Sequence, residues 1–179
     1  MSGLVSCVES ATIEARPARR LRKVVEVRAD PESVFSYLDD VRNTGAHMQR
    51  GGMGGNLEFE TLSENATGVG ASHRWHGKVM GFRVDFTTLV THWVKDREKA
   101  YHTVGEPRMV IMSEFEIRWA LDPTELGTRI SIDFGYQPPQ PWVGRLIGTI
   151  LGRRYGEWCL NMIMADATAA LGPVLTPVG

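Results

Sequence analysis

Cysteine is scarce in this sequence, and net charge is almost absent. The two cysteines, Cys7 and Cys159, are far apart, so we expect neither a disulfide framework nor a multi-cysteine metal site, and a reducing compartment fits this usage. The 20 basic and 21 acidic residues leave a formal net charge of −1. Such a chain offers no basic face for nucleic acid. We therefore expect a cytoplasmic protein without a nucleic-acid partner.

Segments that target or anchor a chain are also missing. Residues 1–20 do not place a basic stretch before an apolar one, as a signal peptide would. The longest apolar candidate, "WVGRLIGTILG" at 142–152, contains Arg145 and falls short of the roughly 20 residues that span a bilayer. We expect one domain over residues 21–173, with a flexible arm before it (1–20) and a short tail after it (174–179).

Several catalytic signatures are lacking as well. The sequence has no Gly-x-Ser-x-Gly nucleophile elbow and no Gly-x-Gly-x-x-Gly turn that opens a helix after a strand. The glycine-rich stretch "QRGGMGGN" (49–56) lacks the Lys-Ser/Thr ending of a phosphate-binding loop, so we interpret it as a plain loop. His73 and His76 fall on opposite faces of a strand, and no Cys or carboxylate cluster completes a zinc site. We expect no metal and no cofactor.

Strand-like segments dominate the middle of the chain. A β-branched run at 21–29 precedes a well-signalled helix, with Asp30 as N-cap and Pro31 at the first helical position, and a second short helix is predicted through 41–48. Over residues 57–136, short β segments alternate with turn signals, which predicts an antiparallel meander. The first strand brings the sheet to about seven strands.

Alternation predicts that the sheet is apolar on one side only. In the last strand, Ile132 and Phe134 share a face that Asp133 opposes. On the outer face, Arg83 and Asp85 are expected to form a solvated pair. The final helix supplies a cover, because its apolar residues recur at helical spacing. Its second half contributes Tyr155, Trp158, Cys159, Met162, Ile163, Ala169 and Ala170. We expect this helix to close one strongly curved sheet.

Three segments carry a resemblance to a known fold. They are "VVEVRADPESVFSYLDDV" (24–41), "GVGASHRWHG" (68–77) and "DFGYQPPQPWVGRLIGTILG" (133–152). With their order, the chain resembles the helix-grip, START-like proteins of the Bet v 1 type and the polyketide cyclase/dehydrase-like (SRPBCC) family, over roughly residues 21–171. The resemblance implies an α+β fold: a curved antiparallel sheet of about seven strands wrapped on a long C-terminal helix, with two short helices after the first strand. It also implies an apolar cavity for lipids, sterols, polyketides, aromatic compounds or other hydrophobic small molecules.

The residues expected to line this cavity are inward-facing apolar side chains and one serine. They are Trp75, Phe82, Phe86, Ser113, Phe115, Ile132, Phe134, Tyr155, Trp158 and Met162. A ligand held there would be chosen by the shape of the cavity and by a few polar groups.

Two titratable residues are candidate acid/base groups. His73 shares the face of Trp75 and can titrate near neutral pH, although a buried, hydrogen-bonded histidine or a rim residue explains the same pattern. A slip of one residue in the register would bring His76 inward instead. Asp166 lies within the apolar stripe of the final helix, where a charge is costly unless it is paired. The alternative for Asp166 is a carboxylate at the margin of that stripe.

Three functions stay open at this point. The first is binding of a hydrophobic small molecule between sheet and helix, and the second is an enzyme of the cyclase or dehydratase type that uses His73 or Asp166. The third is a membrane-peripheral or protein-interaction role. There, residues 142–154 would be an exposed amphipathic segment, with Arg153 and Arg154 beside its apolar side chains.

Overall fold

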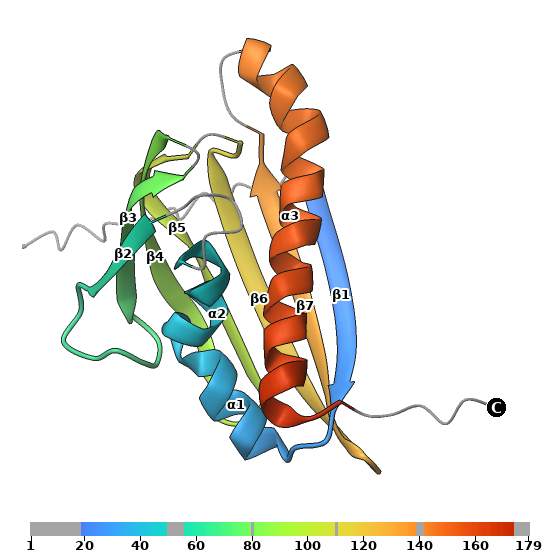
Figure 1. Cartoon of the computed structure of the whole chain (residues 1–179). Coiled ribbons are helices and arrows are strands. Elements are labelled where there is room, and N and C mark those ends of the chain that lie inside the picture. The colour runs from blue at the N-terminus through green and yellow to red at the C-terminus, as the bar shows by residue number, and fades with distance from the viewer. Residues whose placement is uncertain (1–18, 50–55, 80, 110, 139–141, 174–179) are drawn as a thin grey trace, which may run out of the picture.

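The described residues follow the predicted order of a strand, two short helices, six strands and a long helix (Figure 1). The computed structural model describes residues 19–49, 56–79, 81–109, 111–138 and 142–173, with only the backbone for 48, 49, 56 and 142–151. The predicted arm up to residue 18, the tail and most of the glycine-rich stretch lie outside this description. The elements are β1 (Arg19–Val27), α1 (Pro31–Asp39), α2 (Val41–Gln49), β2 (Asn56–Thr61), β3 (Ser72–Val79), β4 (Phe82–Val94), β5 (Glu98–Arg108), β6 (Glu114–Thr124), β7 (Gly127–Gln137) and α3 (Trp142–Leu171).

The strands form one antiparallel sheet in the order β1-β7-β6-β5-β4-β3-β2. Strands β2 to β7 pair with their neighbours in the chain, and β1 joins beside β7. Two register shifts between β4 and β5 add the local twist and bend that bulges produce. Figure 1 shows α3 running along the face formed by β1, β6 and β7, with α1 and α2 beside it. This confirms the helix-grip fold that the sequence predicts.

The start of α1 follows directly from its sequence. The Asp30 carboxylate accepts a hydrogen bond from the Ser33 backbone N–H at 2.9 Å, and Pro31 occupies the first helical position. These contacts satisfy an N–H group that the helix itself leaves without a partner. The predicted N-cap is therefore confirmed, and it fixes where the chain turns from β1 toward the helices.

The helix α3 packs on the sheet through small and large apolar residues. Over residues 152–171, whose side chains are described, the buried positions are Gly152, Gly156, Leu160, Ile163, Met164 and Ala167. A Cβ atom on Gly156 would lie 2.7 Å from Leu21 Cδ1 and 3.0 Å from Phe134 Cε1, so the helix backbone sits closer to the sheet than any larger residue would permit. The prediction that Ala169 and Ala170 belong to the covering stripe is wrong, because both are exposed.

The apolar interior is divided into two clusters. The larger one joins α1 and α3 to β1, β6 and β7, and includes Phe35, Trp119 and Ile163. The smaller one lies on β2, β3 and β4 and includes Trp75 and Phe86. Partly buried side chains, among them those of the β5–β6 connection, pack against both. The two clusters are therefore separate, and the space between them is where a cavity can lie.

None of the helices, taken over the described residues, is both long and apolar enough to cross a bilayer.

Candidate functional site: a cavity between the two clusters

A cavity of about 400 Å³ lies between the two apolar clusters. Its walls come from α2, the strands β2 to β7, the β5–β6 connection and α3. The lining residues are Val41, Thr44, Gly45, His47, Leu57, Trp75, Val79, Phe82, Val84, Phe86, Thr88, Tyr101, Met109, Ile111, Met112, Phe115, Ile117, Phe134, Tyr155, Cys159, Leu160 and Ile163. A cavity of this kind between sheet and helix is what the resemblance implied.

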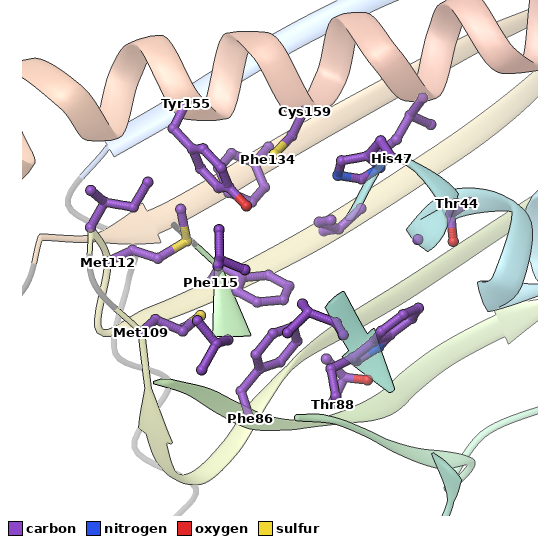
Figure 2. Close-up of a pocket in the computed structure, with 18 of the residues that line it drawn as sticks. Thr44, His47, Phe86, Thr88, Met109, Met112, Phe115, Phe134, Tyr155 and Cys159 are labelled. Carbon is purple, nitrogen blue, oxygen red and sulfur yellow. The ribbon is translucent and has the colours of Figure 1, made fainter. Parts of the chain in front are cut away.

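The two ends of the cavity differ in chemistry. Figure 2 shows Met109, Met112 and Tyr155 at one end, and Thr44 and His47 at the other. Phe82 lies on the β3–β4 hairpin, and it lines the cavity although 57% of its surface is exposed. The cavity therefore reaches solvent near Phe82, Met109 and Ile111, and these three residues define what we call the mouth. The end at α2 is the inner end.

At the mouth end, β5 and β6 part from one another. Their described ladder ends at the pair His102–Glu116, while β5 continues beside β4 to Arg108. At the parting point the Thr103 hydroxyl accepts a hydrogen bond from the Phe115 N–H at 3.1 Å and lies 3.4 Å from the Phe115 carbonyl oxygen. A side chain thus replaces the main-chain partner that a continuous sheet would supply.

One wall of the cavity depends on a glycine in α2. A Cβ atom on Gly45 would overlap the six-membered ring of Trp75. Because the glycine has no side chain, the indole packs directly on the helix backbone. This contact fixes the position of Trp75, and hence the shape of the cavity on the side of β3.

The lining contains no Asp, Glu, Lys or Arg among the described residues. Burial raises the pKa of Tyr101, whose phenol hydrogen-bonds Thr44, and burial also raises the pKa of Tyr155. Burial raises the pKa of the Cys159 thiol to about 12, so it remains protonated and unreactive at neutral pH. The cavity offers an apolar volume with a few hydrogen-bonding groups.

Six of the predicted lining residues are brought together in this cavity. They are Trp75, Phe82, Phe86, Phe115, Phe134 and Tyr155. Ser113, Ile132, Trp158 and Met162 are not among the lining residues. The Ser113 hydroxyl instead donates to the carbonyl oxygen of Pro138 at 3.3 Å, because β6 begins only at Glu114 and Ser113 belongs to the connection.

The structure places His73 inside the protein but not on the cavity wall. His73 is 1% exposed and shares the inner face of the sheet with Trp75, as predicted, while His76 is partly exposed on the outer face. The Nδ1 atom of His73 lies 3.5 Å from the Thr61 hydroxyl, and the Nε2 atom of His73 has no hydrogen-bond partner among the described residues. Burial, and then the charge of Lys99, lower the pKa of His73. A neutral, buried imidazole is the state that these surroundings favour.

Asp166 is half-buried on α3 and is also absent from the cavity wall. It follows the exposed Ala165 and precedes the buried Ala167, so it lies at the margin of the packed face. The structure therefore does not bring His73 and Asp166 together at the cavity. In the described part of the chain, no three His, Cys, Asp or Glu side chains gather as metal ligands.

A buried ion pair escaped the sequence reasoning. Lys99 is 1% exposed, and its Nζ lies 2.6 Å from Asp39 Oδ1 and 3.1 Å from the Asp39 carbonyl oxygen. The Trp93 indole N–H donates to the same carboxylate at 3.2 Å. The pair ties the end of α1 to β4 and β5. In the alternation of β5, Lys99 falls on the face that points inward. A lysine at an inward position is the one feature of the sequence that could have predicted a buried ion pair.

The polar lining residues were missed too. Thr44 and His47 lie on α2, whose inward face has no strong apolar pattern, and Tyr101 lies on β5. The His47 and Trp158 rings meet edge to face, with centroids 5.5 Å apart. This contact links α2 to α3 at the inner end. Only the packing of α2 against α3 shows that these side chains face the cavity.

The outer face of the sheet corrects one predicted pair. Asp85 does not pair with Arg83. Its carboxylate instead forms a bidentate salt bridge with Arg74, whose Nε and Nη2 donate at 2.9 and 2.8 Å. Arg74 also reaches Glu60 at 3.2 Å. Arg83 lies instead directly opposite Lys78 in the β3–β4 ladder.

The sequence matches one protein family over most of its length. Residues 18–161 match the family described as "Polyketide cyclase / dehydrase and lipid transport". No curated protein sequence matches this chain.

Solved structures share the fold at low sequence identity. TTHA0849 from Thermus thermophilus has a TM-score of 0.61 at 19% identity, covering 85% of this chain and 99% of its own. A START superfamily protein from Mycobacterium smegmatis has a TM-score of 0.57 at 15% identity, covering 85% and 96%. Ara h 8.0201 has a TM-score of 0.56 at 11% identity, covering 84% and 98%. At these identities the similarity shows the fold alone.

Proposed function

Because this chain belongs to the polyketide cyclase/dehydrase and lipid transport family, we propose that it binds a neutral, largely apolar small molecule in the cavity between sheet and α3. Family and fold already suggest hydrophobic ligand binding. One observation carries the finer proposal. The cavity reaches solvent at one end, and its described lining residues include no Asp, Glu, Lys or Arg.

The lining favours an uncharged ligand. An ionised carboxylate or amine that enters an apolar space without a partner loses several kcal/mol of hydration. The described lining residues include no Asp, Glu, Lys or Arg that could pair with such a charge. A free fatty acid would therefore bind less well than its alcohol or ester. The aromatic walls favour a ring-containing or isoprenoid body.

The inner end would orient the ligand. Thr44, His47 and Thr88 place hydrogen-bonding groups at the end away from the mouth. The Tyr101 phenol joins them, because it hydrogen-bonds Thr44. A single hydroxyl or carbonyl group on the ligand could hydrogen-bond one of them, while the apolar body extends toward Met109 and Met112. The volume of about 400 Å³ is in the lower part of the range of small-molecule sites, roughly 300–1,000 Å³. One compact ligand fits such a space better than a two-chain lipid.

Native mass spectrometry tests this proposal directly. The purified full-length protein is measured as isolated, and any retained molecule is then identified after denaturing extraction. The expected result is a retained or readily acquired neutral apolar molecule in a one-to-one complex. A protein that stays empty after incubation with fatty alcohols, sterols and aromatic polyketides would contradict the proposal.

A matched pair of variants locates the binding. Cys159 lines the cavity from α3, so Cys159→Phe fills the space and Cys159→Ser nearly preserves its volume. Uptake is expected to be lost in the first variant and kept in the second, with both variants folded by circular dichroism. Equal uptake in both would place the ligand elsewhere.

An enzyme of the cyclase or dehydratase type is the second candidate. The observation in its favour is the cluster of polar side chains at the inner end, which includes the titratable His47. His73 and Asp166 remain candidates only through an indirect role, since neither lines the cavity. Release of a chemically altered molecule that depends on His47 would favour this function over simple binding.

A further inference from the structure

The tip of the β3–β4 hairpin carries two cations beside an exposed aromatic residue. Lys78 and Arg83 lie directly opposite each other in the ladder, and both are exposed. Like charges directly opposite in a sheet destabilise it, and neither side chain is within ion-pair distance of a carboxylate in the described part of the chain. Phe82, between the turn and Arg83, is 57% exposed. This arrangement would be stabilised by an anionic partner with an apolar layer.

The cations belong to a shallow hollow on the outer face of the hairpin. Its lining residues are Arg74, His76, Gly77, Lys78, Arg83 and Asp85. Arg74 pairs with both Asp85 and Glu60, so these three side chains together carry one negative charge, and the positive charge of the hollow comes from Lys78 and Arg83. A third exposed cation, Arg108, faces Asp85 from the end of β5. Arg83 and Arg108 each lie next to a mouth residue in the chain, Phe82 and Met109 respectively.

We propose that this hairpin tip docks on an anionic lipid surface. Phe82 would insert among the acyl chains near the headgroups, and Lys78 and Arg83 would contact the phosphate or carboxylate groups of anionic lipids. The formal net charge of −1 disfavours a nucleic acid, and the exposed Phe82 beside an apolar mouth fits a lipid surface. Docking in this orientation sets the mouth against the bilayer. The use of this contact for ligand exchange rests on the proposed function, but the docking itself does not.

Vesicle co-sedimentation of the full chain tests the docking. The probes are vesicles of phosphatidylcholine alone and of phosphatidylcholine mixed with phosphatidylserine. Each cation near such a surface contributes about 1 kcal/mol, and about 1.4 kcal/mol is tenfold in an equilibrium. The double variant Lys78→Gln with Arg83→Gln is therefore expected to lower the partition coefficient on phosphatidylserine vesicles roughly thirtyfold. Shortening the Debye length from about 10 Å to about 3 Å with 1 M salt is expected to weaken wild-type binding similarly.

Two matched controls separate docking from general charge and hydrophobicity. Arg97→Gln with Arg118→Gln removes two exposed cations away from the mouth, and should leave binding within about twofold. Phe82→Ala should weaken binding, whereas Leu126→Ala, at a residue 59% exposed in the β6–β7 turn, should not.

Three outcomes would overturn the docking proposal. They are equal binding to both kinds of vesicle, equal losses in the two double variants, or tighter binding to DNA than to anionic vesicles. Ligand uptake is measured separately without vesicles, so a failure of the docking leaves the proposed function standing, and the reverse also holds.

Discussion

At the scale of single residues, the Lys99–Asp39 pair gives the first prediction. Removing one partner of a buried ion pair leaves an uncompensated charge in the interior, which costs roughly 3–5 kcal/mol. Asp39→Asn is therefore expected to lower the free energy of unfolding by about this amount, measured by urea denaturation. The comparison is Arg42→Ala, which removes an exposed pair with Asp40 at 2.6 Å and should cost less than about 1 kcal/mol. Similar losses in the two variants would contradict the importance of burial.

His73 gives the second prediction at this scale, a dependence of stability on pH. Burial, then the positive charge of Lys99, lower its pKa in the folded state below the usual value near 6.5. Between these two pKa values the unfolded chain binds the extra proton, so the free energy of unfolding falls as the pH drops below about 6.5, by up to about 1.4 kcal/mol per pH unit. The stability contribution is fully present above that pH.

The matched measurement compares wild type with His73→Leu in urea titrations at several pH values from 8 to about 5. The variant is expected to show a shallower fall below pH 6.5 than wild type, whatever its stability at neutral pH. Parallel curves would show that His73 does not carry the proton linkage. Because His73 does not line the cavity, His73→Leu is expected to keep ligand uptake at pH 8.

At the scale of elements, the close contact of α3 with the sheet gives the third prediction. Gly156→Ala places a Cβ atom against Leu21 and Phe134, and overpacking of this kind costs roughly 1–3 kcal/mol. An unhindered glycine-to-alanine change in a helix would instead be favourable by about 1 kcal/mol. The reverse change Ala169→Gly, on the exposed face, reports that propensity effect alone. A stabilising Gly156→Ala would show that the helix does not pack as tightly as described.

The same helix shows what could be predicted from sequence and what could not. Strand and helix positions followed from turn signals, the Asp30 cap and alternation, because these depend on local chemistry. Large apolar residues at helical spacing predict a face of α3 that differs from the one that packs on the sheet. The packed face includes Gly152 and Gly156, where an added Cβ atom would lie 3.1 Å from Tyr136 and 2.7 Å from Leu21, and a glycine carries no apolar signal. Because the glycine face of α3 packs on the sheet, Tyr155 and Cys159 face the cavity.

The cavity wall was predictable where it is built from regular strands, because alternation is a local pattern. Inward-facing aromatic residues of regular strands, such as Phe86 and Phe134, line the cavity as expected. Alternation failed for Ser113, because it belongs to a connection where β5 and β6 no longer pair. The polar inner end depends on how α2 meets α3, a tertiary contact that no pattern within either segment encodes.

At the scale of the whole molecule, the division of the interior into two clusters gives the fourth prediction. A ligand between the clusters contacts both, and binds only the folded chain. At a ligand concentration of 100 times Kd, it is expected to raise the free energy of unfolding by about 2.7 kcal/mol. Denaturation of wild type and Cys159→Phe with and without ligand measures this, and only wild type should respond. Stabilisation of the filled variant would mean that the ligand binds outside the cavity.

The parting of β5 from β6 bears on the kinetics of exchange. Backbone amides beyond Thr103 that point toward β6 lack the ladder that protects residues up to His102, so we expect them to exchange with deuterium by local opening, well before global unfolding. A ligand that leaves through the same gap has a residence time set by this local motion. Thr103→Val should therefore hasten release, while Asp39→Asn, which weakens the whole fold, should leave the dissociation rate unchanged. How long the ligand stays bound and how stable the protein is would then be independent properties of this chain.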